Sequence, residues 1–119
     1  MEPYPILSIR PTWAYLILRG DKRVENRKWK PLVNGHPYRG QLYIHVGKTF
    51  EDKEEKLQFY AQFPDAKIGG VVGIVELVDC VRDHPSRWAM PDCWHWVLAD
   101  PREIGFVPMK GKLGLFYPT

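Results

Sequence analysis

The sequence predicts an α+β fold, a small mixed β-barrel with two helices packed outside it. Short apolar segments between Ile6 and Tyr117, several of which alternate with polar residues, predict short strands. An apolar stripe between Pro11 and Gly20 predicts an early helix, and a charged amphipathic segment at residues 49–62 predicts a second helix in mid-chain. Short strands with one early and one mid-chain helix favour a barrel with its helices on the outside.

Length and composition are those of one globular domain, residues 1–119. The chain is 45% hydrophobic and 26% charged, and its length allows a single compact core. No apolar run approaches the length that spans a bilayer, and the N-terminus lacks the pattern of a signal peptide. We therefore predict a cytoplasmic protein without a membrane segment, whose two cysteines are thiols. A net charge of +3 tolerates a polyanionic ligand without requiring one.

The first elements are a strand at residues 6–9 and the helix that follows it. Pro11 suits the first turn of a helix, where its missing N–H would be unpaired in any case. Gly20 predicts a left-handed residue that ends the helix, and Arg19 suits its C-terminus. The apolar stripe predicts that this helix docks on a sheet. The stripe consists of Trp13, Ala14, Ile17 and Leu18.

The segment after this helix changes to an alternating pattern at residues 23–29. A strand there places Glu25, Arg27 and Trp29 on one face, with Lys22 at the preceding turn. Long charged side chains held beside a packed helix are how rigid scaffolds present a site. The alternative is a solvated edge strand with an ordinary ion pair, which contributes little to stability.

The middle of the chain predicts a loop, a strand and the second helix. Residues 30–39 contain several turn formers and predict the loop. Residues 41–46 alternate and predict a strand whose even positions face the core, while the odd positions, including His45, face outward or into a groove. The helix at 49–62 has Thr49 as its candidate cap. Its apolar positions are Phe50, Leu57 and Tyr60.

Residues 71–81 are apolar on both faces and predict the central strand. Glu76 would be costly there if buried alone, so it either lines a groove or pairs with Arg10 or Arg27. Residues 82–92 predict an irregular flap near the site. The remaining predicted segments are a strand at 94–99 that Asp100 and Pro101 end, an extended segment at 104–107 and a closing strand at 112–117.

Two segments resemble the ASCH domain family, whose signature is a tryptophan-bearing helix followed by Gly-x-Lys-x-x-Glu-x-Arg. Residues 7–14 read LSIRPTWA, and residues 20–27 read GDKRVENR. The chain departs from the common Arg-Gln-Pro-Trp form of the family, because Pro11 stands one place earlier. The resemblance spans nearly the whole chain and implies a PUA-like barrel. Later segments that agree in order are residues 40–46, 70–79, 96–98 and 108–116.

The charged motif predicts binding of RNA or a nucleotide. A cationic lysine and an arginine fork bind phosphate, and an exposed tryptophan stacks on a base. This combination suits an RNA loop or a single nucleotide better than duplex DNA. The resemblance implies the same, since the ASCH family is similar to RNA-binding PUA domains. The candidate nucleic-acid-binding residues are Arg10, Trp13, Lys22, Glu25, Arg27, Trp29, His45 and Lys48.

An RNA-directed hydrolase is the alternative, with Lys22 and Glu25 as its catalytic residues. The resemblance includes ribonucleases and amidohydrolases that act on acetylated cytidine with a lysine, a threonine and a glutamate. Lys22 matches the lysine, but Glu25 stands at the position of the threonine. A carboxylate this close favours a cationic lysine rather than a nucleophile. A third hypothesis, a purely structural interaction domain, leaves the motif without a function.

Cys80, His84, Cys93 and His95 are the candidate metal ligands, because zinc accepts thiolate and imidazole ligands. Their spacing matches no common zinc module, so we expect no metal. The sequence also lacks a phosphate-binding loop, a serine-hydrolase elbow and a metalloprotease helix. We therefore predict no cofactor, and the oligomeric state stays open.

Overall fold

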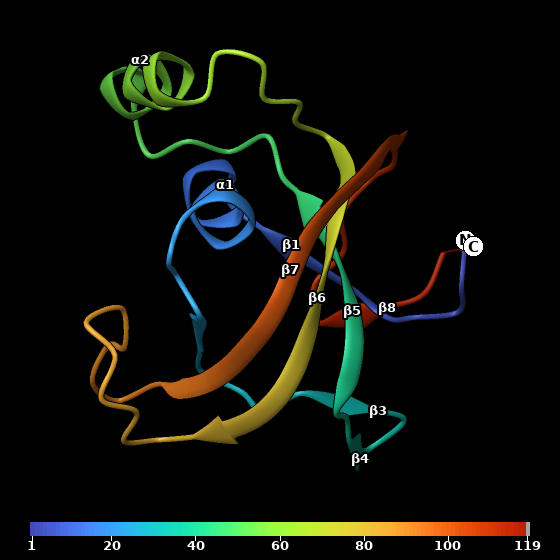
Figure 1. Ribbon diagram of the computed structural model, residues 1–119. Helices are drawn as coiled ribbons and strands as arrows, with labels where there is room; N and C mark the ends of the chain where they lie inside the picture. The colour runs from blue at the N-terminus through green and yellow to red at the C-terminus, as the bar shows by residue number, and fades with distance from the viewer. Residues whose placement is uncertain (119) are drawn as a thin grey trace.

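The fold was determined from a computed structural model that describes residues 1–118, and it confirms the α+β class (Figure 1). The first helix lies against one side of a mixed six-stranded sheet that curls into a half-barrel, and the second helix lies on the outer side of the first. In chain order the elements are β1 (Ile6–Ile9), α1 (Pro11–Arg19), β2 (Val24–Arg27), β3 (Leu32–Val33), β4 (His36–Pro37), β5 (Gly40–Val46), α2 (Lys53–Gln62), β6 (Gly70–Val81), β7 (Trp94–Pro108) and β8 (Leu115–Phe116).

The large sheet has the strand order β2-β7-β6-β5-β1-β8. β1 and β5 run parallel, and every other neighbouring pair in this sheet is antiparallel. β6 lies inside the sheet, as its apolar sequence predicts. β2 pairs with the first half of β7, and β1 lies two places beyond β6 in the sheet order. Because the sheet curls into a half-barrel, β1 and β2 come close together although they are not neighbours in the sheet, and Arg27 of β2 donates to the backbone oxygen of Ser8 in β1.

β7 corrects the predicted break at Asp100 and Pro101, since the strand runs through both residues. Ala99 pairs with Glu76 and Arg102 pairs with Ile74, so the two intervening residues form a bulge opposite a single residue of β6. Asp100 has φ of 50°, a conformation that aspartate tolerates better than most residues. A bulge bends a strand without ending it, and this one adds to the curl of the sheet.

The main core lies between the sheet and the helices. α1 contributes buried Ala14, Ile17 and Leu18, in agreement with its predicted apolar stripe, whereas Trp13 stays 44% exposed at its edge. The second helix covers the first through Phe59, whose ring centroid lies 5.6 Å from that of Tyr15. Within residues 1–118, no helix has the length and apolarity needed to cross a membrane.

Of the odd positions of β5, Tyr43 is only 2% exposed and belongs to a core, so its prediction is wrong, whereas His45, also 2% exposed, lines a cavity. A smaller core lies on this face of the sheet, where Tyr43 packs with Ile6 and Val71. The C-terminal segment contributes Phe116 to this cluster and covers the face that would otherwise meet solvent. Alternation along one strand cannot reveal a distant segment that returns to cover it.

The second helix begins later than predicted. Asp52 caps it by accepting a hydrogen bond from the backbone N–H of Glu55 at 2.8 Å, so Thr49 is not the cap. Phe59 is its buried residue, whereas Leu57 is 73% exposed. Tyr60 and Phe50 pack against the core as predicted, although Phe50 precedes the helix, which starts at Lys53.

Gly20 ends α1 for a reason other than the predicted left-handed conformation. Its φ is −110°, but a Cβ there would lie 2.8 Å from the carbonyl oxygen of Leu16. The predicted loop at 30–39 contains a small hairpin of β3 and β4, turned by Asn34 and Gly35 at positive φ. The predicted closing strand is reduced to the two residues of β8.

Candidate functional site

Lys22, Glu25 and Arg27 form a buried ionic cluster beside the first strand. The Lys22 ammonium donates to Glu25 Oε1 at 2.9 Å and also to the backbone oxygen of Val24. The other carboxylate oxygen of Glu25 accepts from Arg27 Nε at 3.1 Å. Lys22 is only 3% exposed and Glu25 only 7%, so these charges mainly satisfy one another. An ammonium has three donors, which leaves Lys22 one N–H for a ligand.

Arg27 connects this cluster to β1. One of its terminal nitrogens donates to the backbone oxygen of Ser8 at 2.8 Å and lies 2.9 Å from Glu25 Oε2. Its side chain keeps 22% of its surface exposed. The guanidinium therefore fixes β2 against β1 and still presents one edge to solvent.

A cavity of about 290 Å³ opens above the Lys22–Glu25 pair. Trp13 and Trp88 stand beside it with their rings 6.5 Å apart and at 76° to one another. Ligand pockets are roughly 300–1,000 Å³, so this space suits one small planar group. Its lining residues are Trp13, Lys22, Glu25, Asn26, Arg87, Trp88 and Met90.

The flap at residues 82–92 contributes Arg87, Trp88 and Met90 to the lining of this cavity, so it lies beside the charged motif. Asn26 holds it by donating to the oxygen of Trp88 and accepting from the N–H of Met90, both at 2.9 Å. Asp21 holds it a second time, because its carboxylate accepts two hydrogen bonds from Arg87, each at 3.0 Å. These hydrogen bonds lower the pKa of Asp21 below its ordinary value.

A second cavity of about 370 Å³ continues from the first, and the two share Trp13, Glu25 and Asn26. Together they form what we term the motif cleft. Trp29 borders the second cavity, is 36% exposed and packs edge-on against buried Trp96 at 5.0 Å. The other residues of the second cavity are Ser8, Arg10, Arg27 and Lys28.

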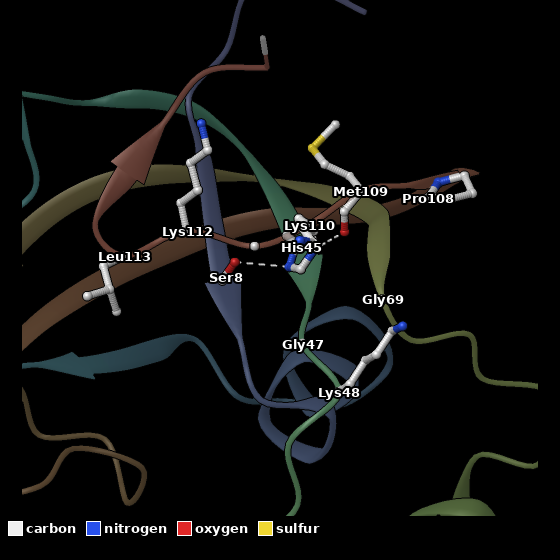
Figure 2. Close-up of a pocket in the computed structure, with 11 residues that line it drawn as sticks. Ser8, His45, Gly47, Lys48, Gly69, Pro108, Met109, Lys110, Lys112 and Leu113 are labelled. Carbon is white, nitrogen blue, oxygen red and sulfur yellow. Dashed lines mark hydrogen bonds between the residues drawn. The ribbon is translucent and has the colours of Figure 1, made fainter.

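The structure therefore brings six of the eight predicted binding residues together. The motif cleft contains Arg10, Trp13, Lys22, Glu25, Arg27 and Trp29. His45 and Lys48 lie apart from it, in a cavity of about 900 Å³ on the far side of Ser8 (Figure 2). His45 is buried, with Nδ1 bonded to Ser8 Oγ at 2.9 Å and Nε2 to the oxygen of Met109 at 2.6 Å.

The sequence profile of the ASCH domain family matches residues 7–108. The chain belongs to the ASCH domain family. This ASCH domain is 32% identical over 125 residues to the human and mouse proteins named activating signal cointegrator 1. The matched region is 89% of this chain but 21% of each relative, so the chain spans about a fifth of the length of these curated relatives.

Crystal structures of an ASCH protein from Zymomonas mobilis and of a mutant of it share the fold of this ASCH domain. Both superpose with a TM-score of 0.66, at 16% and 15% sequence identity respectively. The wild-type match covers 98% of this chain and 88% of that one, and the mutant match covers 99% and 91%. At this identity the likeness concerns the fold.

Several residues of the site lacked a clear signal in the sequence. Arg87 and Trp88 place a cation beside an aromatic ring, 4.3 Å from its centroid, a pairing that could have marked the flap as part of the cleft. The alternating pattern places Asn26 on the face of its strand opposite Glu25 and Arg27. Its side chain holds the flap from there. Ser8 carried no signal, because its importance comes from two neighbours far along the chain.

The four candidate metal ligands have other roles in this ASCH domain. The ring of His95 accepts from the N–H of His84 at 3.1 Å and bonds the oxygen of Met90 at 2.6 Å, which fastens the flap to β7. Cys80 and Cys93 are free thiols, and burial raises the pKa of Cys80. In the described part of the chain, no three acidic, histidine or cysteine side chains converge as a metal site would require.

Glu76 lies on a different part of the sheet from the motif. Its carboxylate accepts a hydrogen bond from Gln41 at 3.5 Å, and the other end of the Gln41 amide accepts from Arg102 at 3.0 Å. Of the two alternatives left open for Glu76, the pair with Arg10 or Arg27 is therefore wrong. Glu76 is half-buried, and this polar neighbourhood removes the cost that a fully buried carboxylate would carry.

Proposed function

We propose that this ASCH domain binds single-stranded RNA, or a nucleotide of it, in the motif cleft. The observation that carries the proposal is the position of two exposed tryptophans beside the buried ionic cluster. Lys22 Nζ lies 5.7 Å from the ring centroid of Trp13, and Arg27 Cζ lies 5.7 Å from that of Trp29. Aromatic rings next to cations are typical of surfaces on which unpaired bases stack.

The proposed roles follow from exposure. Trp13 and Trp29 offer ring surface for stacking, which contributes about 1–3 kcal/mol per base. Arg10 and Lys28 are exposed at the rim and supply charge for phosphates, together with the free edge of Arg27. Lys22 and Glu25 form the floor, where the remaining ammonium N–H can donate to an acceptor on the base edge.

The dimensions of the cleft favour a single strand over a duplex. The cavity of about 290 Å³ that Trp13 and Trp88 border accepts one extruded base. Reading a duplex requires a helix or ribbon in its major groove, whereas the wall here is a flap held by hydrogen bonds. Membership of the ASCH family, which resembles RNA-binding PUA domains, supports the same class of ligand.

Fluorescence anisotropy with a labelled single-stranded RNA tests the proposal. Trp13→Ala should weaken binding by about 5- to 100-fold, the effect of one lost stacking contact, whereas Trp13→Phe should retain most of the affinity. A fully paired RNA of the same length should bind more weakly than the single strand. Equal affinity of wild type and Trp13→Ala would refute the proposed site.

The same preparation tests the hydrolase alternative. We expect neither cleaved RNA nor deacetylated cytidine after incubation with the wild-type protein. An arginine cannot act as a neutral amine, so turnover that disappears in a folded Lys22→Arg variant while binding persists would identify Lys22 and Glu25 as catalytic. That result would overturn the assignment as a binding domain.

A further inference from the structure

The cavity of about 900 Å³ beside the motif cleft has a uniform charge. Three lysines line it and no acidic residue does, and the described chain places none of these lysines in an ion pair. We term this cavity the lysine groove (Figure 2). The three lysines are Lys48, at the end of β5, and Lys110 and Lys112, in the loop between β7 and β8.

A chain of hydrogen bonds connects the lysine groove to the motif cleft. The backbone oxygen of Ser8 accepts from Arg27 at 2.8 Å, and its hydroxyl meets His45 Nδ1 at 2.9 Å. His45 Nε2 then bonds the oxygen of Met109, the residue before the lysine loop, at 2.6 Å. Since a carbonyl can only accept, Nε2 carries the proton, and in the neutral ring the Ser8 hydroxyl donates to Nδ1. Ser8 borders both cavities.

Two glycines let the chain lie close to these groups. A Cβ on Gly111 would lie 2.5 Å from Ser8 Oγ and 2.9 Å from His45 Cε1, so the loop backbone rests directly on this pair. A Cβ on Gly69 would lie 2.5 Å from Lys48 Cε, so the stem of that lysine crosses the glycine. The backbone that carries Lys110 and Lys112 is therefore closely packed against Ser8 and His45. In the view of Figure 2, Lys48 and Lys112 lie on opposite sides of His45.

We propose that the lysine groove binds backbone phosphates of the same nucleic-acid strand whose base occupies the motif cleft. This inference rests on the proposed function. The strand would cross Ser8, because that residue joins the two cavities. Lysine is a compact point charge that suits mobile phosphates, whereas recognition of one fixed group is the strength of arginine. The ligand is thus a single strand several nucleotides long, and a mononucleotide fills only the motif cleft.

Salt titrations of binding test this inference with Lys110→Gln/Lys112→Gln. For single strands, the slope of log affinity against log salt falls by about 0.7 for each lost phosphate contact. The double variant should therefore flatten the slope for a ten-nucleotide RNA by about 1.4. It should bind a mononucleotide within about twofold of wild type, because that ligand does not reach the groove. Lys53→Gln/Lys56→Gln on α2 removes the same amount of charge outside the groove and should leave the affinity and the salt slope for both ligands unchanged.

The outcomes separate this inference from the proposed function. If the double variant keeps the wild-type slope while Trp13→Ala still weakens binding of the ten-nucleotide RNA, the lysine groove is not part of the site and the motif cleft remains. If Trp13→Ala has no effect on either ligand, the proposed function fails, and this inference with it. A polyglutamate peptide that competes as well as the RNA would also overturn the inference, since the groove would then prefer an acidic protein.

Discussion

The motif cleft and the lysine groove use the same residue type in opposite ways. Lys22 in the cleft is 3% exposed and donates to Glu25, whereas Lys110 and Lys112 in the groove are exposed. A buried ammonium that is paired with a carboxylate holds the surrounding side chains in position, because the protein already accepts most of its hydrogen bonds. An exposed charge without such a partner is available to a ligand and makes binding depend on salt. Charge type alone therefore does not tell which lysine supplies affinity.

The largest effect is expected from breaking the buried pair. Glu25→Gln leaves Lys22 buried beside a neutral amide, and losing one partner of a buried pair typically costs about 3–5 kcal/mol of stability. Urea denaturation should show a loss of this size. Glu103→Gln, which breaks a more exposed pair with Arg19, is the control and should lower stability far less. Equal losses would mean that the cluster does not fix the cleft.

The next prediction concerns a substitution that should displace Lys110 and Lys112 without removing their charge. Gly111→Ala forces a Cβ against Ser8 and His45, so the loop must shift away from its base. The salt slope for a ten-nucleotide RNA should flatten, as we also expect when the lysines are replaced, although the net charge is unchanged. Gly105→Ala is the matched control, because a Cβ there meets no atom within 4 Å. A wild-type slope in Gly111→Ala would show that the loop does not need its present position.

The smallest expected effect concerns the flap. Asp21→Asn removes the carboxylate that accepts two hydrogen bonds from Arg87, while the contacts of Asn26 remain. RNA affinity should fall by only a few-fold, because exposed ion pairs contribute little. Asp65→Asn is the control, since that carboxylate is also exposed and paired with an arginine, but lies outside both cavities. A loss as large as that of Trp13→Ala would mean that the flap, rather than stacking, governs binding.

The pH dependence of this flap contact has a definite sign. The pKa of Asp21 is lowered by its hydrogen bonds from Arg87. The stabilisation from the Asp21–Arg87 contact is therefore fully present above the pKa of a free aspartate. It is lost only as the pH falls through the lower pKa that Asp21 has in the folded protein. RNA affinity between pH 6 and 8 should not change through Asp21.

Local patterns were enough to predict α1, β1, β2 and most of the motif cleft. Pro11 and the apolar stripe define the helix, and alternation puts Glu25 and Arg27 on one face, where they do form an ion pair. The lysine groove could not be predicted, because it depends on a contact between His45 and Met109, sixty-four positions apart. The same return of the C-terminal segment buries Tyr43 on the face of β5 that alternation had placed outward or in a groove.

The indole N–H signals in an NMR titration with single-stranded RNA test the central claim most directly. The chain has five tryptophans, which report from different places in one experiment. The signals of Trp13, Trp29 and Trp88, which border the motif cleft, should shift with added RNA. Trp94 lies outside the cleft, in a separate small cavity with Lys30, and its signal should stay in place. If the signal of Trp94 shifts while those of Trp13 and Trp29 do not, RNA does not bind in the motif cleft.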